Sequence, residues 1–427
     1  MTRKAKSSNL TRAKRNKKDE FYTQIRDIEQ ELLHYRDQFR GKVIYCNCDD
    51  PVESEFYRYF HLNFHFFGMK KLLSTHYDKD NPTYSLVYEG GTCEESDNDY
   101  NSYDQKIPLK EDGDFRSDES IDLLKQSDIV VTNPPFSLFR EYVAQLIKYK
   151  KKFIIWRNLN AVTYKEIFPL IKDQKMWIGF TANKTCIFRL ADDYTKWDKK
   201  ATAEHNDGHK YGKVPSITVY TNMPIKKPTD RVILWETFSQ DKFPTYDNYA
   251  GFECSKVSHL PQKNEIDAWI DKNRLTDFKH TYQSDLTVKE ERDDKVLVHI
   301  KRPVFGVPIT FLCKYNPSEI GGGVKQTGSV WQTSTTSSAM NNHSASAEKQ
   351  PTSRVRESTA ESLFDQDKLA KHFEILGEAS GNSYRNMPKL LERLSFHPEM
   401  KYGGGLGSAL INGKAKYSRI LIRSRYC

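Results

Sequence analysis

Short apolar runs alternate with amphipathic segments between residues 19 and 236. Ile25, Ile28, Leu32 and Leu33 have the spacing of one face of a helix. Apolar runs typical of buried strands follow in the order GKVIYC, KKLLST, SDIVVT, KKFIIW, KMWIGF and VPSITVYT. Helical patterns separate several of these runs, and such alternation is typical of a parallel sheet with helices on both faces. The predicted fold class is α/β, with a Rossmann-like, doubly wound sheet.

The same pattern divides the chain into three regions. Residues 1–18 are basic and poor in apolar side chains, and we predict a flexible arm that either contacts phosphates or only solubilises the chain. Residues 19–236 form the predicted α/β domain. In residues 237–427 the periodicity weakens, although VLVHIKRPVFGVPITFL and KYSRILIRSRYC are strand-like. Residues 321–358 are rich in Gly, Ser, Thr, Asn and Gln, so we expect a disordered insert there.

The segment SDIVVTNPPFSLFREYV joins a strand pattern to a helix pattern. Pro134 and Pro135 have no N–H to donate, so the strand must end before them. Each proline also holds the residue before it in an extended conformation, which stiffens Asn133 and Pro134. Ser137 is a candidate N-cap for the helix that follows. Because open α/β sheets bind ligands at the carboxyl ends of their strands, Asn133 is expected to face a ligand.

Composition narrows the possible partners and the compartment. The 427 residues are 37% hydrophobic and 29% charged, with a net charge of +9, which suits either a polyanion-binding protein or a generally basic one. No apolar run approaches the roughly 20 residues that span a bilayer, and no secretory signal is evident. Seven cysteines without a regular framework fit a reducing compartment, so we expect a cytoplasmic protein. Cys46 with Cys48, and His205 with His209, lack further ligands, so no metal site is predicted.

The corner after the predicted strand has chemistry suited to an amino group. The side-chain oxygen of Asn133 and the carbonyl of Pro134 both accept hydrogen bonds, and side by side they can hold both protons of a planar amine. The nitrogen lone pair is then directed at an electrophile, which would be a methyl group on sulfonium. Phe136 offers a flat face on which a ring can stack. The plainer interpretation is a strand end with a buried phenylalanine.

At this point several motifs together resemble the EcoRI-type adenine-specific DNA methyltransferases. They include FYT at 21–23, CNCDDP at 46–51, DGDF at 112–115 and TNPPFSLFREYV at 132–143. Shorter matches follow, among them NLNAVTYKEIFPLIK, WIGF, YDNYA, GVPITFL, KYNP and RILIR. The resemblance covers most of residues 19–255 and then short blocks. It implies a methyltransferase sheet with a C-terminal DNA-recognition region.

The resemblance also implies an activity. Its donor would be S-adenosylmethionine, and its acceptor the 6-amino group of an adenine flipped out of duplex DNA. Asn133 and Pro134, supported by Pro135, would hold the amino group, and Phe136 would stack on the base. The order of segments is the family's gamma arrangement, which favours a monomer. A partner restriction endonuclease is a further possibility that the chain alone does not reveal.

Donor-binding residues are also carried over from the resemblance. Phe21 and Thr23 match the N-terminal segment that flanks the donor. Asp49 and Asp50 occupy the turn after the first strand, where the methionine end of the donor is bound in this superfamily. The segment that contacts the donor adenine is matched by Asp114 and Phe115.

Two departures from the usual pattern bear on these expectations. The first turn has no glycine-rich loop, so CNCDDPVES must form the donor pocket with side chains, as in the EcoRI-type family. The C-terminal half is longer than the family pattern, with insertions near 264–302 and 321–358. The recognition sequence therefore does not transfer.

Several other residues have two interpretations each. Trp156 and Trp177 either line the base pocket or pack in the core, and Asp78 either binds the donor ribose or is a solvated loop acid. The last arginines alternate along a strand-like end, where they contact phosphates or carry plain surface charge; they are Arg419, Arg423 and Arg425.

Two alternative functions are also compatible with the sequence. The same chemistry could act on RNA or on a glutamine amide, although the protein-modifying enzymes have tyrosine where this chain has Phe136. Alternatively, the chain is a non-catalytic DNA-binding relative that has lost its donor pocket. The intact NPPF and DGDF segments count against that alternative.

Overall fold

The computed structural model describes the chain in segments. These are residues 21–48, 51–52, 54–78, 81–90, 105–190, 202–204, 209–225, 242–244, 246, 251–256, 266–271, 286–292, 295–300, 304–317, 373–379, 410–411, 414–416 and 418–424. The predicted arm at 1–18 and the predicted insert at 321–358 lie outside the described residues, as does the boundary at 236.

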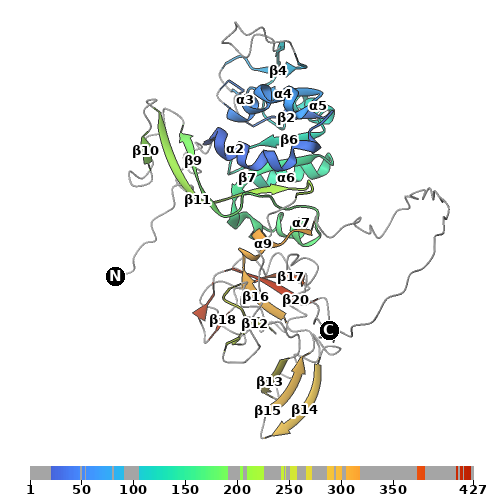
Figure 1. Ribbon diagram of the computed structural model, residues 1–427, viewed down its shortest axis with the longest axis vertical. Coiled ribbons are helices and arrows are strands. Elements are labelled where there is room, and N and C mark those ends of the chain that lie inside the picture. The colour runs from blue at the N-terminus through green and yellow to red at the C-terminus, as the bar shows by residue number, and fades with distance from the viewer. Residues whose placement is uncertain are drawn as a thin grey trace, which may run out of the picture.

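Eleven strands of the described residues form one large mixed sheet (Figure 1). They are β1 (Phe21–Thr23), β2 (Val43–Cys46), β3 (Lys71–Thr75), β4 (Tyr84–Tyr88), β5 (Gln105–Pro108), β6 (Ile129–Thr132), β7 (Lys152–Asn158), β8 (Trp177–Ile178), β9 (Lys184–Leu190), β10 (Thr202–Glu204) and β11 (Lys210–Thr221). The main path runs β1-β9-β11-β7-β6-β2-β3-β4-β5, and β8 and β10 both pair with β11.

The middle of this sheet is parallel and doubly wound. β2 pairs in parallel with β3 on one side and with β6 on the other, and β6 pairs in parallel with β7. The chain goes from β2 outward to β3 and later returns to β6, so the strand order reverses between β2 and β6. Both flanks of the sheet are antiparallel. The predicted α/β class is confirmed, and the reversal point is where such sheets bind ligands.

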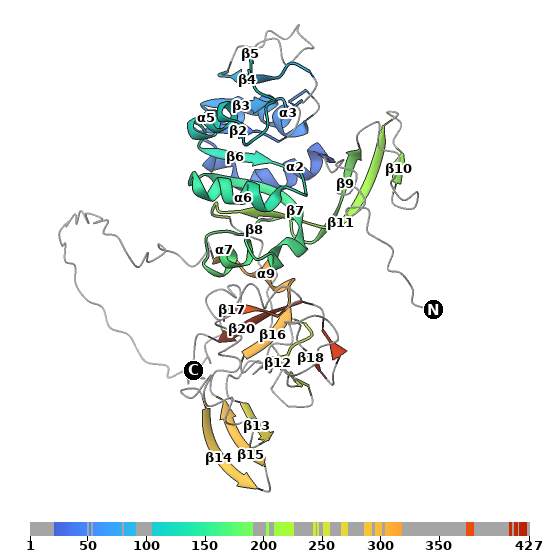
Figure 2. The same cartoon turned by 180° about the vertical axis from the view of Figure 1, so that it is seen from behind.

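Helices cover both faces of the sheet (Figures 1 and 2). One face carries α2 (Ile25–Leu32), η1 (Leu33–Gln38), α3 (Glu55–Leu62) and α4 (Phe64–Phe67). The other face carries α5 (Asp118–Gln126), α6 (Phe139–Lys148), η2 (Leu159–Thr163) and α7 (Phe168–Lys172). α5 begins at a serine cap whose side chain accepts from a backbone N–H. α6 lacks such a cap and starts after Leu138, so Ser137 was wrongly predicted as its N-cap.

Strand alternation divides the interior into two cores. In β2, Tyr45 packs toward α5 and α6, while Ile44 packs toward α2 and α3. The core under α2, α3 and α4 is rich in phenylalanine, with Phe39, Phe60 and Phe67 in mutual ring contact. Because all three rings are buried, specific ring-to-ring packing stabilises the helices on this face in addition to hydrophobic burial.

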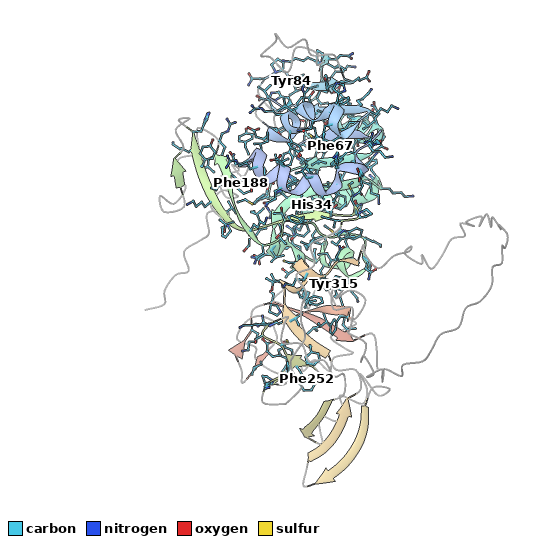
Figure 3. All side chains as sticks on the ribbon, viewed as in Figure 1. His34, Phe67, Tyr84, Phe188, Phe252 and Tyr315 are labelled. Atoms are coloured by element: carbon cyan, nitrogen blue, oxygen red, sulfur yellow. The ribbon has the colours of Figure 1, made fainter. Side chains whose placement is uncertain are left out.

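The second core continues into the C-terminal part of the chain. One sheet there has the order β12-β16-β20-β17, formed by β12 (Phe252–Glu253), β16 (Val304–Pro308), β17 (Phe373–Ala379) and β20 (Arg419–Ser424). After β16 comes the short helix α9 (Phe311–Lys314), and Phe311 and Tyr315 pack in the same apolar cluster as α6 and α7. Figure 3 shows Tyr315 where the C-terminal part meets the large sheet, and Phe252 further from it.

Two smaller units complete the described C-terminal residues. A three-stranded antiparallel sheet contains β13 (Ile266–Asp271), β15 (Lys295–Ile300) and β14 (Leu286–Arg292), and β18 (Leu410–Ile411) pairs with β19 (Lys414–Ala415). The segment VLVHIKRPVFGVPITFL, predicted to be strand-like, is divided between β15 and β16, which belong to different sheets. None of the described helices has the length and apolar character needed to cross a membrane.

Arg419 lies inside the C-terminal sheet rather than at the surface. Its Nη2 is 2.7 Å from Oε1 of Glu253, its Nε is 3.0 Å from the same oxygen, and the Tyr246 hydroxyl donates to Oε2. Both side chains of the ion pair are almost buried. Neither interpretation given for Arg419 from the sequence is therefore correct, since the arginine is neither at a phosphate-facing surface nor a plain surface charge.

Candidate active site

The Asn-Pro-Pro-Phe corner follows β6 at the point where the sheet reverses. Asn133 comes directly after Thr132 and is 5% exposed, and Phe136 is 7% exposed. The amide of Leu138 donates to the carbonyl of Pro135 at 3.0 Å, which closes a turn between strand and helix. The expected order of strand, corner and helix is thus confirmed. The four corner residues lie together at the carboxyl edge of the sheet.

A second group of residues lies at the carboxyl end of β2. Asn47 follows this strand and is 2% exposed, and the Tyr142 hydroxyl of α6 donates to its Oδ1. Burial raises the pKa of Tyr142 well above its ordinary value, so the hydroxyl stays protonated and remains a donor. Tyr142 also packs edge-on against Phe115, with ring centroids 5.1 Å apart. α6 therefore ties the turn after β2 to the DGDF segment.

The DGDF segment is a tight turn whose shape depends on glycine. Gly113 has φ +74°, and a Cβ there would lie 2.1 Å from the backbone oxygen of His76. The Asp114 carboxylate accepts from Arg116 at Nε (2.8 Å) and Nη2 (2.7 Å). The hydrogen bond to Asp114 raises the pKa of Arg116. The structure thus pairs Asp114 with an arginine and buries Phe115 against α6.

Two buried polar atoms near the turn after β2 have no hydrogen-bond partner among the described residues. Oγ1 of Thr23 and Nδ2 of Asn47 make no hydrogen bond within the described part of the chain, although both side chains are about 2% exposed. β1, which carries Thr23, contacts α3, the helix that begins just after the turn that follows β2. Since buried polar atoms ordinarily have partners, these two are suited to a polar ligand.

Three of the predicted donor-binding residues lie wholly or partly outside the described residues. β1 contains the backbone of Phe21, paired with Leu190 of β9, but its side chain lies outside the described residues. Asp49 and Asp50 also lie outside them. His205 is not described either, and within the segments that are described, no group of three or more His, Cys, Asp or Glu side chains could hold a metal.

The structure shows the surroundings of Trp156, Trp177 and Asp78, which each had two interpretations from the sequence. Trp156 is fully buried and packs edge-on against Phe56 at 4.8 Å, so it belongs to the core. Trp177 is half-buried, and its Nε1 donates to the carbonyl of Met223. Asp78 accepts from the backbone and side chain of Asn81, as a turn acid does.

Sequence reasoning missed three residues near the site. Asn47 was visible within CNCDDP, in the same turn as the two aspartates. Tyr142 lies within the segment TNPPFSLFREYV but was not predicted as a site residue. Arg157, directly after KKFIIW, was not predicted as one either, yet its guanidinium carbon lies 4.3 Å from the centroid of the Phe136 ring. The short polar residues that directly follow a strand were the available signal for Asn47.

A large mixed α/β sheet with this corner at its reversal point is consistent with the methyltransferase class of enzymes. Comparison with known proteins gives the family. Residues 9–267 match the family described as adenine-specific methyltransferase EcoRI. The chain belongs to this family and is a DNA adenine methyltransferase, a transferase of the kind that methylates DNA in restriction–modification.

The relatives are similar over most of their length. The type II methyltransferase M.EcoRI of Escherichia coli is 39% identical over 329 residues, which is 75% of this chain and 89% of the relative. M.MpnI of Mycoplasma pneumoniae is 37% identical over 258 residues, covering 59% and 76%. M.MgeORF184P of Mycoplasma genitalium is 32% identical over 313 residues, covering 73% and 84%. No solved structure matches the chain significantly.

Proposed function

We propose that the enzyme transfers a methyl group from S-adenosylmethionine to the 6-amino group of an adenine flipped out of duplex DNA. The observation that carries the proposal is the position of the Asn133–Phe136 corner. It lies at the carboxyl end of β6, beside the reversal between β2 and β6, where a donor on the β2 side and an acceptor on the β6 side can meet. The family membership supports the same reaction.

Within this corner, two oxygen acceptors hold the amine. The side-chain oxygen of Asn133 and the carbonyl of Pro134 each accept one N–H of the amino group. Both protons are then held in place, and the nitrogen lone pair is turned out of conjugation with the ring. Phe136 stacks on the base and fixes its plane. Pro134 and Pro135 keep the acceptors rigid, so little reorganisation is needed on binding.

Bound S-adenosylmethionine supplies a methyl group on a positively charged sulfur. The N–C bond forms as the C–S bond breaks, and the bonding electron pair moves to sulfur. The amino nitrogen would then release one of the two protons that Asn133 and Pro134 hold to solvent water, which leaves a neutral methylated amine. Because the electrophile is already cationic, neutral acceptors are sufficient and no carboxylate is required at position 133.

The donor is proposed to lie against residues from three segments. Asn47 and Thr23 offer buried polar atoms, and Phe115 offers a ring held by α6. Asp114 would approach the donor together with its partner Arg116. The same proposal assigns the remaining donor contacts to Phe21, Asp49 and Asp50.

We further propose that residues 237–427 recognise the target sequence. The C-terminal part shares an apolar core with α6 and α7, and β17 contacts α7, so it is packed against the catalytic domain. A basic chain with a net charge of +9 suits duplex DNA. Monomeric action, a cytoplasmic location and functional pairing with a restriction endonuclease complete the proposal.

Two measurements test it. Transfer of labelled methyl from S-adenosylmethionine is compared among duplex DNA, RNA and protein acceptors, and calorimetry measures donor binding to the protein alone. We expect donor binding and label on the adenine 6-amino group of duplex DNA only. Label on RNA or protein would contradict the proposed acceptor. Absence of donor binding would favour a non-catalytic DNA-binding protein.

A further inference from the structure

Arg157 is a buried arginine on the acceptor side of the catalytic corner. It belongs to β7, which pairs with β6 on the side away from β2. Thr132, the last residue of β6, is paired with Ile155, so the corner and Arg157 both lie just beyond this pair in their own segments. The side chain is 8% exposed. Because donor-side residues follow β2, Arg157 is placed to meet the acceptor.

The guanidinium of Arg157 lies over two aromatic rings and is hydrogen-bonded at one nitrogen. Its carbon lies 4.3 Å from the ring centroid of Phe136 and 5.4 Å from that of Phe139. Nη2 donates to the hydroxyl of Tyr164 at 3.3 Å. The other two nitrogens, Nε and Nη1, are buried and make no hydrogen bond to any described residue. Arg157 also forms no ion pair with the described acidic residues.

A purely structural role does not account for these two nitrogens. Contact with aromatic rings stabilises the charge of a guanidinium but supplies no strong acceptor for its N–H groups. The side chain is always charged, and a buried charge is costly unless it is both paired and hydrogen-bonded. The missing partner is therefore an anion with acceptor oxygens, and guanidinium matches phosphate geometry well.

Duplex DNA brings such an anion to this place. A base that enters the corner carries its own sugar and phosphates, and the phosphates are the charged groups nearest to it. We propose that Arg157 binds a phosphate of the flipped nucleotide and so holds the adenine in the corner. This inference rests on the proposed base-flipping site. Arg157 is a positioning residue, because the phosphate it binds is not a reacting group.

The test measures DNA binding in the presence of a donor analogue that lacks a transferable methyl group. Wild type, Arg157→Gln and Arg157→Lys are compared on a specific duplex and on the same duplex with one methylphosphonate, placed 5′ or 3′ of the target adenine. The matched control is Lys125→Gln, which removes an exposed positive charge in the last turn of α5, at the amino end of β6. Circular dichroism and donor binding confirm that each variant is folded.

We expect one of the two methylphosphonates to weaken wild-type binding roughly thirtyfold. Arg157→Gln should bind normal DNA about as weakly and should not respond to that methylphosphonate. Its log Kd should depend on log salt with a slope smaller by about 0.9, as expected for one lost phosphate contact. Arg157→Lys should recover part of the affinity, and Lys125→Gln should behave as wild type.

Two outcomes overturn the inference. The first is wild-type binding of both methylphosphonate duplexes as tight as binding of normal DNA, a result that does not depend on the folding of any variant. The second is that the losses of binding free energy from Arg157→Gln and from the methylphosphonate are additive. A duplex with 7-deazaadenine at the target, which lacks the N7 acceptor of the base, adds a further check. If wild type loses affinity for this duplex, Arg157→Gln does not, and neither methylphosphonate weakens wild-type binding, then Arg157 binds the base instead. Activity of Asn133→Ala would instead contradict the proposed site itself.

Discussion

Replacing Tyr142 by phenylalanine removes one hydroxyl from the link between α6 and the turn after β2. Asn47 Oδ1 then stays buried and loses its hydroxyl donor, keeping only the weak thiol donor of Cys48 at 3.7 Å. A buried acceptor that loses its strong donor costs about 1–3 kcal/mol. The ring itself is kept, so its contact with Phe115 is preserved. We therefore expect the free energy of unfolding to fall by that amount without loss of the fold.

The same substitution should weaken donor binding. Once its Oδ1 is released, the Asn47 amide can rotate, and Nδ2 no longer has a fixed direction. If Nδ2 donates to the bound donor, losing about 1.4 kcal/mol of that interaction raises the Kd of S-adenosylmethionine about tenfold. Isothermal titration calorimetry measures the Kd, and urea denaturation measures stability on the same preparations.

Tyr45→Phe is the matched control. Tyr45 is also fully buried, but its hydroxyl pairs with Oγ1 of Thr75 at 3.2 Å and lies 3.5 Å from the carbonyl of Ser120, and it does not bond to Asn47. It should lose about 1 kcal/mol of stability and keep its donor affinity. If Tyr142→Phe and Tyr45→Phe bind the donor equally well, Asn47 is not oriented for the donor by Tyr142, and the proposed contact is wrong.

Three further predictions concern the framework around the site. Gly113→Ala should destabilise the protein by more than about 2 kcal/mol and weaken donor binding, because the added Cβ would meet a backbone oxygen. The control Gly41→Ala, at φ +68° with no atom near its Cβ, should cost less stability. Equal losses of the two variants in urea denaturation would contradict this. Glu253→Gln and Arg419→Met should each cost about 3–5 kcal/mol, but the double variant should cost less than their sum, and additive losses would contradict a buried pair. Glu31→Gln should cost about 1.5–3 kcal/mol, since this buried carboxylate accepts from backbone amides after β8, and an unchanged urea midpoint would contradict it.

The parts of the site that the sequence predicted depend on local chain chemistry. Two prolines end β6 wherever that strand lies, so the Asn133 corner could be placed at a strand end without knowing its neighbours. The alternation of strands and helices likewise predicted the doubly wound middle of the sheet. The N-cap at Ser137 failed because the chain makes a turn through Leu138 before α6 starts.

The parts that were not predicted depend on residues far apart in the sequence. Tyr142 and Asn47 are separated by 95 positions, and only the packing of α6 on the sheet brings them together. Arg419 was interpreted from its alternating neighbours, but its partner Glu253 is 166 positions away. β12, which carries Glu253, and β20, which carries Arg419, both pair with β16, and no local pattern encodes those pairings.

The most direct test of the catalytic corner is single-turnover methylation by Asn133→Ala on duplex DNA, with donor binding measured on the same protein. We expect methyl transfer to be abolished while S-adenosylmethionine binds with wild-type affinity, because the corner holds the acceptor and not the donor. Retention of near-wild-type transfer by this variant would contradict the role assigned to Asn133.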